Sequence, residues 1–302
     1  MELIGVNVGG TTSSVVRGDE SGKVVDRRTF STRRERGSAA LYAEIVATIE
    51  ALRTSASRAI GVAIGGPLDA ARGVVLNAPH LPFRDFPLLE RLREDLAIPV
   101  AVHHDAAACA LAEWHWGPDA GVAGLAYLTC GTGFGVGLVL DGRVRYGSSG
   151  HSPEIGHVRY RDHGPEIFGK PGCFEGFGSA TALALLARAR NAPRFATSTP
   201  AQIAALSAEG DREASEIVAE NARAVGAACA LLADLLVLDV IVLGSLARYL
   251  GRPWIALVRE RFEGEALPAN AAHCRLRAPM EDVQDLSGLA AAVQALPSPA
   301  GG

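Results

Sequence analysis

At residues 3–12 the chain reads LIGVNVGGTT, which predicts a buried strand followed by a turn of two glycines and two threonines. Glycine has no Cβ, so this turn leaves its backbone N–H groups open to an anion, and the threonine hydroxyls add donors. β-prone runs at residues 13–17 and 23–29 continue the pattern, and we predict an antiparallel meander at the start of the chain. The candidate phosphate-binding residues of the turn are Gly9, Gly10, Thr11 and Thr12.

The same order of strand and glycine turn recurs near the middle of the chain. Residues 122–133 read VAGLAYLTCGTG, and residues 136–140 and 143–146 predict a hairpin after the turn. This loose repeat predicts an α/β fold of two similar lobes with a ligand cleft between them. A pair of such turns suits a polyphosphate, whereas one turn alone is weak evidence. The second turn contributes Gly131, Thr132 and Gly133.

The two commonest nucleotide-binding motifs are missing from the sequence. Val136 occupies the last glycine position of GxGxxG, and no GxxxxGK(S/T) occurs, so Rossmann and P-loop folds are disfavoured. The remaining chain alternates between predicted helices and buried strands. Helices are predicted at residues 41–52, 106–114, 179–190, 200–208 and 211–236, with Asp211 as N-cap of the last, and strands at 60–64, 99–102 and 240–243.

Length, composition and charge limit the classes of protein to which this chain can belong. With 302 residues, 48% of them hydrophobic and 21% charged, the chain is long and apolar enough for two packed domains. The net charge is −4 and no basic run of five or more occurs, which disfavours nucleic acid or an anionic membrane as a partner. The longest apolar stretch, residues 227–242, is interrupted by Asp234 and Asp239 and is too short to span a bilayer.

Cysteine usage and the first residues predict a cytoplasmic protein. The five cysteines are odd in number and lack CxxC spacing, which indicates reduced thiols. The first residues show none of the charged start, apolar region and cleavage site of a signal peptide. We therefore expect small-molecule partners, and neither a nucleic acid nor a membrane.

A series of short motifs extends along nearly the whole chain. They are IGVNVGGT at 4–11, GGPLD at 65–69 with LNAP at 76–79, HDA at 104–106, GTGFG at 131–135, EIGH at 154–157, GCFE at 172–175 and LGS at 243–245. In order and spacing they resemble the ROK family (repressors, open reading frames and kinases), whose enzymes include bacterial glucokinases, fructokinases and N-acetylhexosamine kinases. The resemblance implies an actin-like (ribonuclease H-like), two-lobed sugar-kinase fold. We expect a small lobe at 1–105, on which a C-terminal helix near 286–296 packs back, and a large lobe at 106–285.

The resemblance also implies a role for each motif residue. Asp105 is the catalytic base, since a sugar hydroxyl that attacks a γ-phosphoryl group must be oriented and must lose its proton. Considered without the flanking motifs, Asp105 is better explained as the N-cap of the helix that follows it, and the motifs together favour catalysis. Gly244 and Ser245 lie by the adenosine, the two glycine turns hold the phosphates, and Mg²⁺ binds through phosphates and water near Asn7 and Asp105. The implied sugar-binding residues are Gly66, Asn77, His80, His104, Glu154, His157 and Glu175.

One departure from the family concerns zinc. In many members a histidine at the position of His157 binds a structural zinc beside a CxCGxxGC loop. That loop aligns with residues 166–173, where Glu166 and Phe168 replace two cysteines and Cys173 remains. One histidine and one cysteine do not complete a four-ligand site, so we predict no structural zinc.

Three further departures leave the sugar open. Asn7 replaces the family aspartate of the first turn, His104 replaces the asparagine before the catalytic aspartate, and His80 stands where glucose kinases commonly have a sugar-binding asparagine. An imidazole at position 104 favours a sugar altered near C3. The alternative is that His104 only packs at the end of the strand and that the protein is an ordinary glucokinase. The candidates are glucose, 3-amino-3-deoxyglucose (kanosamine) and N-acetylmannosamine.

The predicted function is an ATP- and Mg²⁺-dependent kinase that phosphorylates the C6 hydroxyl of a hexose or amino-hexose, acting as a homodimer. One alternative is a sugar-binding pseudokinase, which Asn7 motivates. The other is a sugar-responsive regulator of the same family. It is disfavoured because the first phosphate turn starts at residue 9, which leaves no room for a preceding DNA-binding segment.

Overall fold

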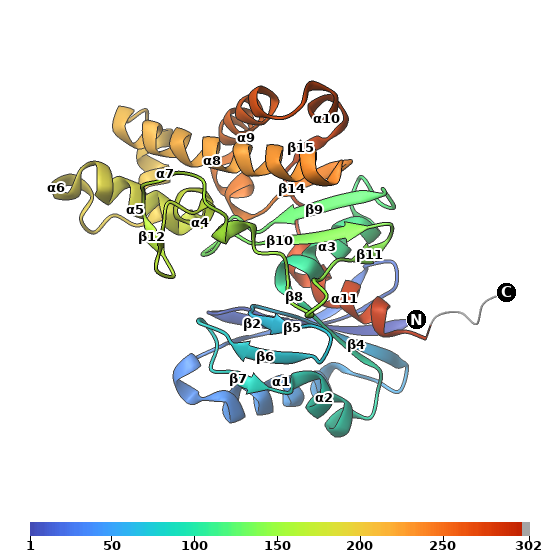
Figure 1. Ribbon diagram of the computed structural model, residues 1–302. Coiled ribbons are helices and arrows are strands. Elements are labelled where there is room, and N and C mark those ends of the chain that lie inside the picture. The colour runs from blue at the N-terminus through green and yellow to red at the C-terminus, as the bar shows by residue number, and fades with distance from the viewer. Residues whose placement is uncertain (298–302) are drawn as a thin grey trace. The chain divides into compact units, whose positions relative to one another are not determined.

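A computed structural model describes residues 1–297 of the chain, which divide into two compact units (Figure 1). The first unit comprises Met1–Gly121, Gly142–Ser152 and residues 280–297, and the second Val122–Asp141 and Pro153–Pro279. We expected residues 106–121 in the large lobe. They group with the first unit because helix α3 (Asp105–Trp116) packs against the C-terminal helix α11 (Val283–Ala295).

The first unit is built on a mixed sheet of strand order β3-β2-β1-β4-β8. The strands are β1 (Glu2–Val8), β2 (Thr12–Asp19), β3 (Val24–Ser31), β4 (Ser57–Ile64) and β8 (Val100–His104). β1, β2 and β3 form the antiparallel meander predicted from the sequence, while β1, β4 and β8 run parallel. Parallel neighbours require crossover connections, and helices provide them.

Helices cover both faces of this sheet (Figure 1). On one face Leu41, Ile45 and Ile49 of α1 (Ser38–Leu52) pack with α2 (Leu88–Leu96) against alternate residues of the strands. On the other face α11 packs on β1 and β4. The unit also contains η1 (Arg34–Arg36), β11 (Arg143–Val144) and a small sheet of β5 (Leu68–Asp69), β6 (Val74–Asn77) and β7 (Arg84–Phe86).

Glycines allow α11 to approach the sheet backbone closely. A Cβ on Gly61 would lie 2.0 Å from the Ala292 nitrogen, and a Cβ on Gly288 would lie 2.4 Å from the Val6 nitrogen. No side chain fits in such a space, so only glycine permits this packing. The predicted C-terminal helix therefore docks on the N-terminal strands through backbone contact.

The second unit repeats the strand–turn–strand start and then becomes helical. The strands that this unit contributes to its sheet have the order β10-β9-β14-β15. They are β9 (Gly124–Leu128), β10 (Val136–Leu140), β14 (Val240–Leu243) and β15 (Arg275–Arg277). Short elements follow: η2 (Ile155–His157), the hairpin β12 (Glu166–Ile167) and β13 (Lys170–Pro171), and α4 (Phe174–Gly178). The remaining helices are α5 (Ala180–Arg190), α6 (Ala192–Phe195), α7 (Pro200–Ala208), α8 (Arg212–Leu236), α9 (Ser245–Glu265) and α10 (Pro268–His273).

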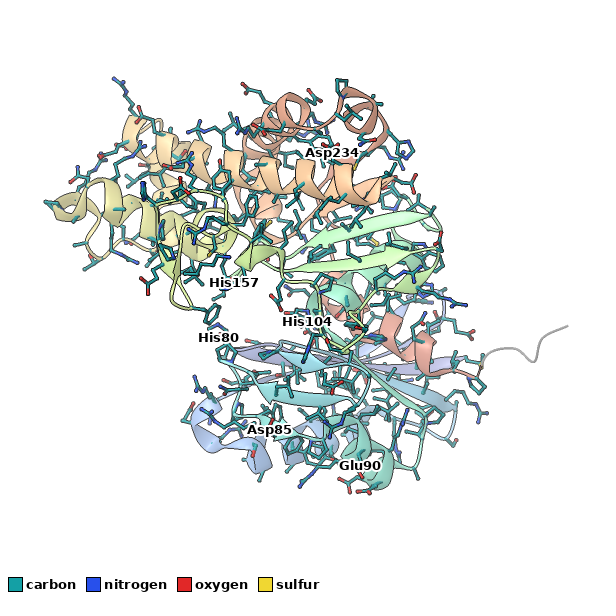
Figure 2. The ribbon with its side chains drawn as sticks, in the orientation of Figure 1. His80, Asp85, Glu90, His104, His157 and Asp234 are labelled. Atoms are coloured by element: carbon teal, nitrogen blue, oxygen red, sulfur yellow. The ribbon has the colours of Figure 1, made fainter. Side chains whose placement is uncertain are left out.

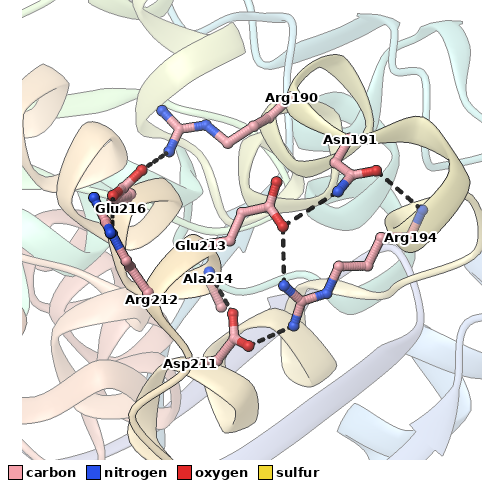
Figure 3. Close-up of polar contacts among 8 residues, drawn as sticks. All are labelled: Arg190, Asn191, Arg194, Asp211, Arg212, Glu213, Ala214 and Glu216. Carbon is pink, nitrogen blue, oxygen red and sulfur yellow. Dashed lines mark hydrogen bonds and ion pairs between the residues drawn. The ribbon is translucent and has the colours of Figure 1, made fainter.

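Helix caps and ion pairs fix the long helix α8 in this unit. Asp211 is its N-cap, as predicted, and accepts a hydrogen bond from the Ala214 N–H at 2.9 Å. Figure 3 shows the other carboxylate oxygen of Asp211 paired with Arg194, which also donates to Glu213 at 2.9 Å. The pair holds the pKa of Asp211 below its ordinary value. The start of α8 is thereby attached to α6.

Two further sequence expectations concern cysteines and membranes. All five cysteines are buried thiols: Cys109, Cys130, Cys173, Cys229 and Cys274. Burial raises the pKa of Cys130 to about 12, so this thiol is unreactive at neutral pH. Within residues 1–297, every helix is too short or too polar to cross a bilayer.

Candidate active site

In the first unit, candidate site residues follow three parallel strands and lie at one edge of the sheet. The register aligns Val8 of β1 with Ile64 of β4, and Ile64 with His104 of β8. All three strands run in the same direction, so the residues that follow them meet at the carboxyl edge, where open α/β sheets bind ligands. This edge contains the turn after β1, the Gly65–Gly66 segment after β4, and Asp105.

The first glycine turn is held from behind by Thr32. Its hydroxyl donates to the Gly9 carbonyl at 2.6 Å, and its N–H donates to the Thr11 carbonyl at 2.9 Å. A Cβ on Gly9 would lie only 2.7 Å from the Thr12 carbonyl oxygen, so the turn needs glycine there. Thr11 and Thr12 are exposed, and their hydroxyls are available to a ligand. Thr32 belongs to none of the sequence motifs, and its only signal is its place just beyond the strand that pairs with β2.

His80 lies beside this turn. A Cβ on Gly10 would stand 2.9 Å from the His80 Cβ, so the glycine makes room for the histidine. The Arg34 guanidinium donates to the Pro79 carbonyl at 2.6 Å and fixes the segment that carries His80. Asn77 is exposed at the end of β6, where it pairs with Arg84 of β7. Figure 2 labels His80 together with His104.

Asp105 is the first residue of α3 and does not cap the helix. The cap position is His104, which makes no side-chain cap bond, so the N-cap interpretation of Asp105 is wrong. The Asp105 Oδ1 atom accepts from the Ala106 N–H at 2.6 Å, and 44% of the side chain is exposed. The carboxylate is therefore accessible at the strand edge. The His104 Nδ1 atom lies 3.2 Å from Oδ1, an approach without hydrogen-bond geometry.

In the second unit, the other glycine turn lies against the start of α9. The Gly131 N–H donates to the Gly133 carbonyl at 3.1 Å, and the Gly131 carbonyl accepts from Ala180 at 2.7 Å. A Cβ on Gly244 would stand 2.3 Å from the Thr129 carbonyl oxygen, which lets the backbones touch. A glycine turn next to a helix N-terminus concentrates N–H donors and positive potential, which is the chemistry of phosphate binding. Thr132 and Ser245 are exposed there.

Glu175 connects this turn to the other polar candidates of the second unit. Its Oε2 atom accepts from the Phe134 N–H at 3.0 Å and would lie 3.1 Å from a Cβ on Gly133. Gly156 packs on the same turn, because a Cβ there would stand 2.1 Å from the Phe134 carbonyl oxygen. Its neighbours Glu154 and His157 are both exposed (Figure 2 labels His157). The second unit thus brings polar side chains next to its glycine turn.

The segment aligned with the zinc loop forms the β12–β13 hairpin. Phe168 and Gly169 make its tip with positive φ values of 50° and 73°. Cys173 follows the hairpin and is fully buried, whereas His157 is exposed. Within residues 1–297, histidine, cysteine and carboxylate side chains do not gather in any group of three or more that could hold a metal ion.

Comparison with known proteins decides the family. The model of the ROK family matches residues 3–293. The chain belongs to the ROK family. A glucokinase from Halalkalibacterium halodurans is 30% identical over 284 residues, which cover 88% of this chain and 86% of that protein. An N-acetylmannosamine kinase from Salmonella arizonae is 29% identical over 227 residues, 74% of this chain and 76% of that one.

A solved structure extends the likeness to three dimensions. The Streptomyces griseus ROK family glucokinase in complex with glucose and AMPPNP superposes with a TM-score of 0.80 at 26% identity, over 97% of this chain and all of that one. The predicted family and the actin-like, two-lobed fold of ROK sugar kinases are therefore confirmed. The chain is similar to ROK sugar kinases that differ in their sugar.

Proposed function

We propose that this ROK protein is an ATP-dependent sugar kinase that phosphorylates the C6 hydroxyl of a hexose or amino-hexose. The observation that carries the proposal is the place of Asp105, an accessible carboxylate at the same strand edge as the Gly9–Thr12 turn. A carboxylate and a phosphate-binding turn at one edge are the two elements that phosphoryl transfer to a hydroxyl requires. Similarity to a glucokinase that binds glucose and AMPPNP supports it.

In the proposed reaction, Asp105 orients the sugar hydroxyl and accepts its proton. The hydroxyl oxygen attacks the γ-phosphorus, the bond between this phosphorus and the β–γ bridging oxygen breaks, and ADP leaves with that electron pair. The protonated carboxyl then returns its proton to solvent. General-base catalysis of this kind contributes roughly 10²- to 10⁴-fold to a rate.

The phosphoryl donor is proposed to contact residues from both glycine turns and the start of α9. These are Gly9, Gly10, Thr11, Thr12, Gly131, Thr132, Gly133, Gly244 and Ser245. Mg²⁺ prefers oxygen ligands and water, which the Asp105 carboxylate and the Asn7 amide can supply or orient at the strand edge. The ion would neutralise charge on the phosphates.

The sugar is proposed to contact Gly66, Asn77, His80, His104, Glu154, His157 and Glu175. Vicinal hydroxyls are both donors and acceptors, which suits a set of carboxylates, imidazoles and an amide. The negative charges of Asp105, Glu154 and Glu175 favour a sugar with an ammonium group, such as 3-amino-3-deoxyglucose. Glucose and N-acetylmannosamine are the other proposed substrates. We further propose a cytoplasmic homodimer.

Asn7 favours one other function, a pseudokinase that binds sugar without turnover, because a neutral amide orients Mg²⁺-bound water less strongly than a carboxylate does. One assay separates the two. ADP release is followed with glucose, 3-amino-3-deoxyglucose, glucosamine, N-acetylmannosamine and 6-deoxyglucose. A kinase turns over at least one C6-hydroxylated sugar and leaves 6-deoxyglucose unchanged. Sugar binding without ADP release from any of them would overturn the kinase proposal.

A further inference from the structure

The geometry points to Tyr146 as a positioning residue that fixes the backbone carrying the catalytic base. This inference rests on the proposed role of Asp105. Tyr146 lies in the segment Gly142–Ser152, which is distant in sequence from β8 but belongs to the same compact unit. Tyr146 lies in none of the sequence motifs, and the sequence predicts only that it ends a hairpin strand.

The Tyr146 hydroxyl contacts both histidines that precede Asp105. Its Oη atom accepts from the His104 N–H at 3.2 Å and lies 2.9 Å from the His103 Nδ1 atom. The rings of His103 and Tyr146 stack with an interplanar angle of 4° and centroids 5.9 Å apart. One hydroxyl therefore bridges two consecutive residues at the junction of β8 and α3.

The proton arrangement in this bridge follows from the donor inventory. Because Oη accepts from the His104 N–H, its own proton is free to be donated to His103 Nδ1. Desolvation lowers the pKa of His103 to about 4, so its imidazole is neutral at pH 7. In the tautomer that carries its proton on Nε2, the Nδ1 atom accepts from the Tyr146 hydroxyl. Desolvation also raises the pKa of Tyr146, with a smaller contribution in the same direction from the Asp105 charge. In this arrangement, the His104 N–H, the Tyr146 hydroxyl and the His103 Nδ1 atom each have a hydrogen-bond partner.

The bridge matters because Asp105 follows His104 directly. On its other side the His104 ring is confined by Gly66, where a Cβ would stand 2.7 Å from its Cδ2 atom. Tyr146 binds the His104 backbone, and Gly66 leaves room for the His104 ring. Together they fix the position from which Asp105 begins α3. A base displaced by about 1 Å can lose roughly 10²-fold in rate.

The segment that carries Tyr146 is itself anchored. The Gly150 carbonyl accepts from the Ala70 N–H at 2.9 Å, and the Gly147 N–H donates to the His151 carbonyl at 2.8 Å. A Cβ on Gly150, whose φ is 80°, would lie 2.7 Å from the Asp69 carboxylate. Tyr146 therefore projects from a fixed turn.

The test begins with Tyr146→Phe, which keeps the stacked ring and removes the hydroxyl. We expect kcat to fall about 10- to 100-fold with little change in the KM for ATP, because the base is misplaced while the donor site is untouched. Amide hydrogen exchange of peptides covering residues 100–108 should quicken. The matched control is Tyr42→Phe, which removes a hydroxyl bonded to Asp95 at 2.6 Å elsewhere in the unit and should leave kcat and this exchange unchanged.

A second set of variants distinguishes a specific effect on the position of Asp105 from a general loss of local stability. His103→Asn places an amide oxygen near the position of Nδ1 and should keep most of the turnover, whereas His103→Leu should lose it as Tyr146→Phe does. The Tyr146→Phe, His103→Leu pair should be strongly non-additive, since both remove one bridge. Wild-type kcat and unchanged exchange in Tyr146→Phe would overturn the inference. If the wild type phosphorylates no sugar, the proposed function fails, and the exchange data still decide whether Tyr146 anchors the backbone.

Discussion

The imidazole of His104 lies against Gly66, so closely that a Cβ on residue 66 would stand 2.7 Å from His104 Cδ2 and 2.8 Å from Nε2. The same ring has its Nδ1 atom 3.2 Å from Asp105 Oδ1, and only 15% of its side chain is exposed. An imidazole in this position is held between a glycine and the proposed base. It replaces the amide that the family resemblance leads one to expect.

We expect His104→Asn to change the ranking of sugars. A neutral imidazole presents one donor and one acceptor on opposite edges and can accept from an ammonium group, whereas an amide presents both together. The kcat/KM of glucose relative to 3-amino-3-deoxyglucose should therefore rise about 10-fold or more in the variant. An unchanged ranking among these sugars, glucosamine and N-acetylmannosamine would show that His104 does not select the substrate.

His103 makes stability depend on pH. Its pKa is lowered by desolvation from 6.5 to about 4 in the folded protein, so the unfolded chain binds more protons between these values. The contribution of the neutral His103 to the free energy of unfolding is therefore complete above pH 6.5. As the pH falls toward 4, the free energy of unfolding decreases by about 1 to 3 kcal/mol. Urea unfolding at pH 7 and pH 4.5 should show a larger loss for the wild type than for His103→Asn. Equal losses in the two proteins would contradict this assignment.

Asn7 should set the Mg²⁺ requirement. A neutral amide orients Mg²⁺-bound water less strongly than a carboxylate, so Asn7→Asp should reach half-maximal activity at a lower Mg²⁺ concentration. The measurement is the Mg²⁺ dependence of ADP release at saturating sugar. Thr32→Ser, which keeps the hydroxyl behind the same turn, serves as a control. Superimposable Mg²⁺ curves for wild type and Asn7→Asp would show that Asn7 does not set the Mg²⁺ requirement.

The zinc prediction is tested on the purified protein. The β12–β13 hairpin is held by its own backbone pairing, and the Arg159 guanidinium donates to the Pro171 carbonyl at 3.0 Å. Elemental analysis without added metal should find far less than one zinc per chain, and chelators should leave the thermal midpoint unchanged. A stoichiometric zinc would mean that the loop was aligned wrongly.

Periodicity and glycine turns predict much of this fold. The meander of β1 to β3, the strand of residues 240–243 and the helices predicted at 200–208 and 211–236 appear within a few residues of the expected bounds. The division of the chain was harder to predict. Contact of α3 with α11 groups residues 106–121 with the first unit, and no local pattern in either helix encodes that partner.

Some residues of the candidate site could be predicted from the sequence, and others could not. Motif residues such as Asp105 and the two glycine turns could be found because their order along the chain is distinctive. Thr32 and Tyr146 could not, because each acts through one hydroxyl on the backbone of a residue distant in sequence. A threonine after a strand or a tyrosine in a hairpin is common, and only the three-dimensional structure shows which carbonyl or N–H it meets.

The measurement that tests the central claim most directly compares wild type with Asp105→Asn in sugar-dependent ADP release at saturating ATP and sugar. The substitution keeps the shape of the side chain and removes the proton acceptor. We predict that kcat falls roughly 10²- to 10⁴-fold while the circular dichroism spectrum and sugar affinity stay close to wild type. Turnover by Asp105→Asn at the wild-type rate would contradict the assignment of Asp105 as the base.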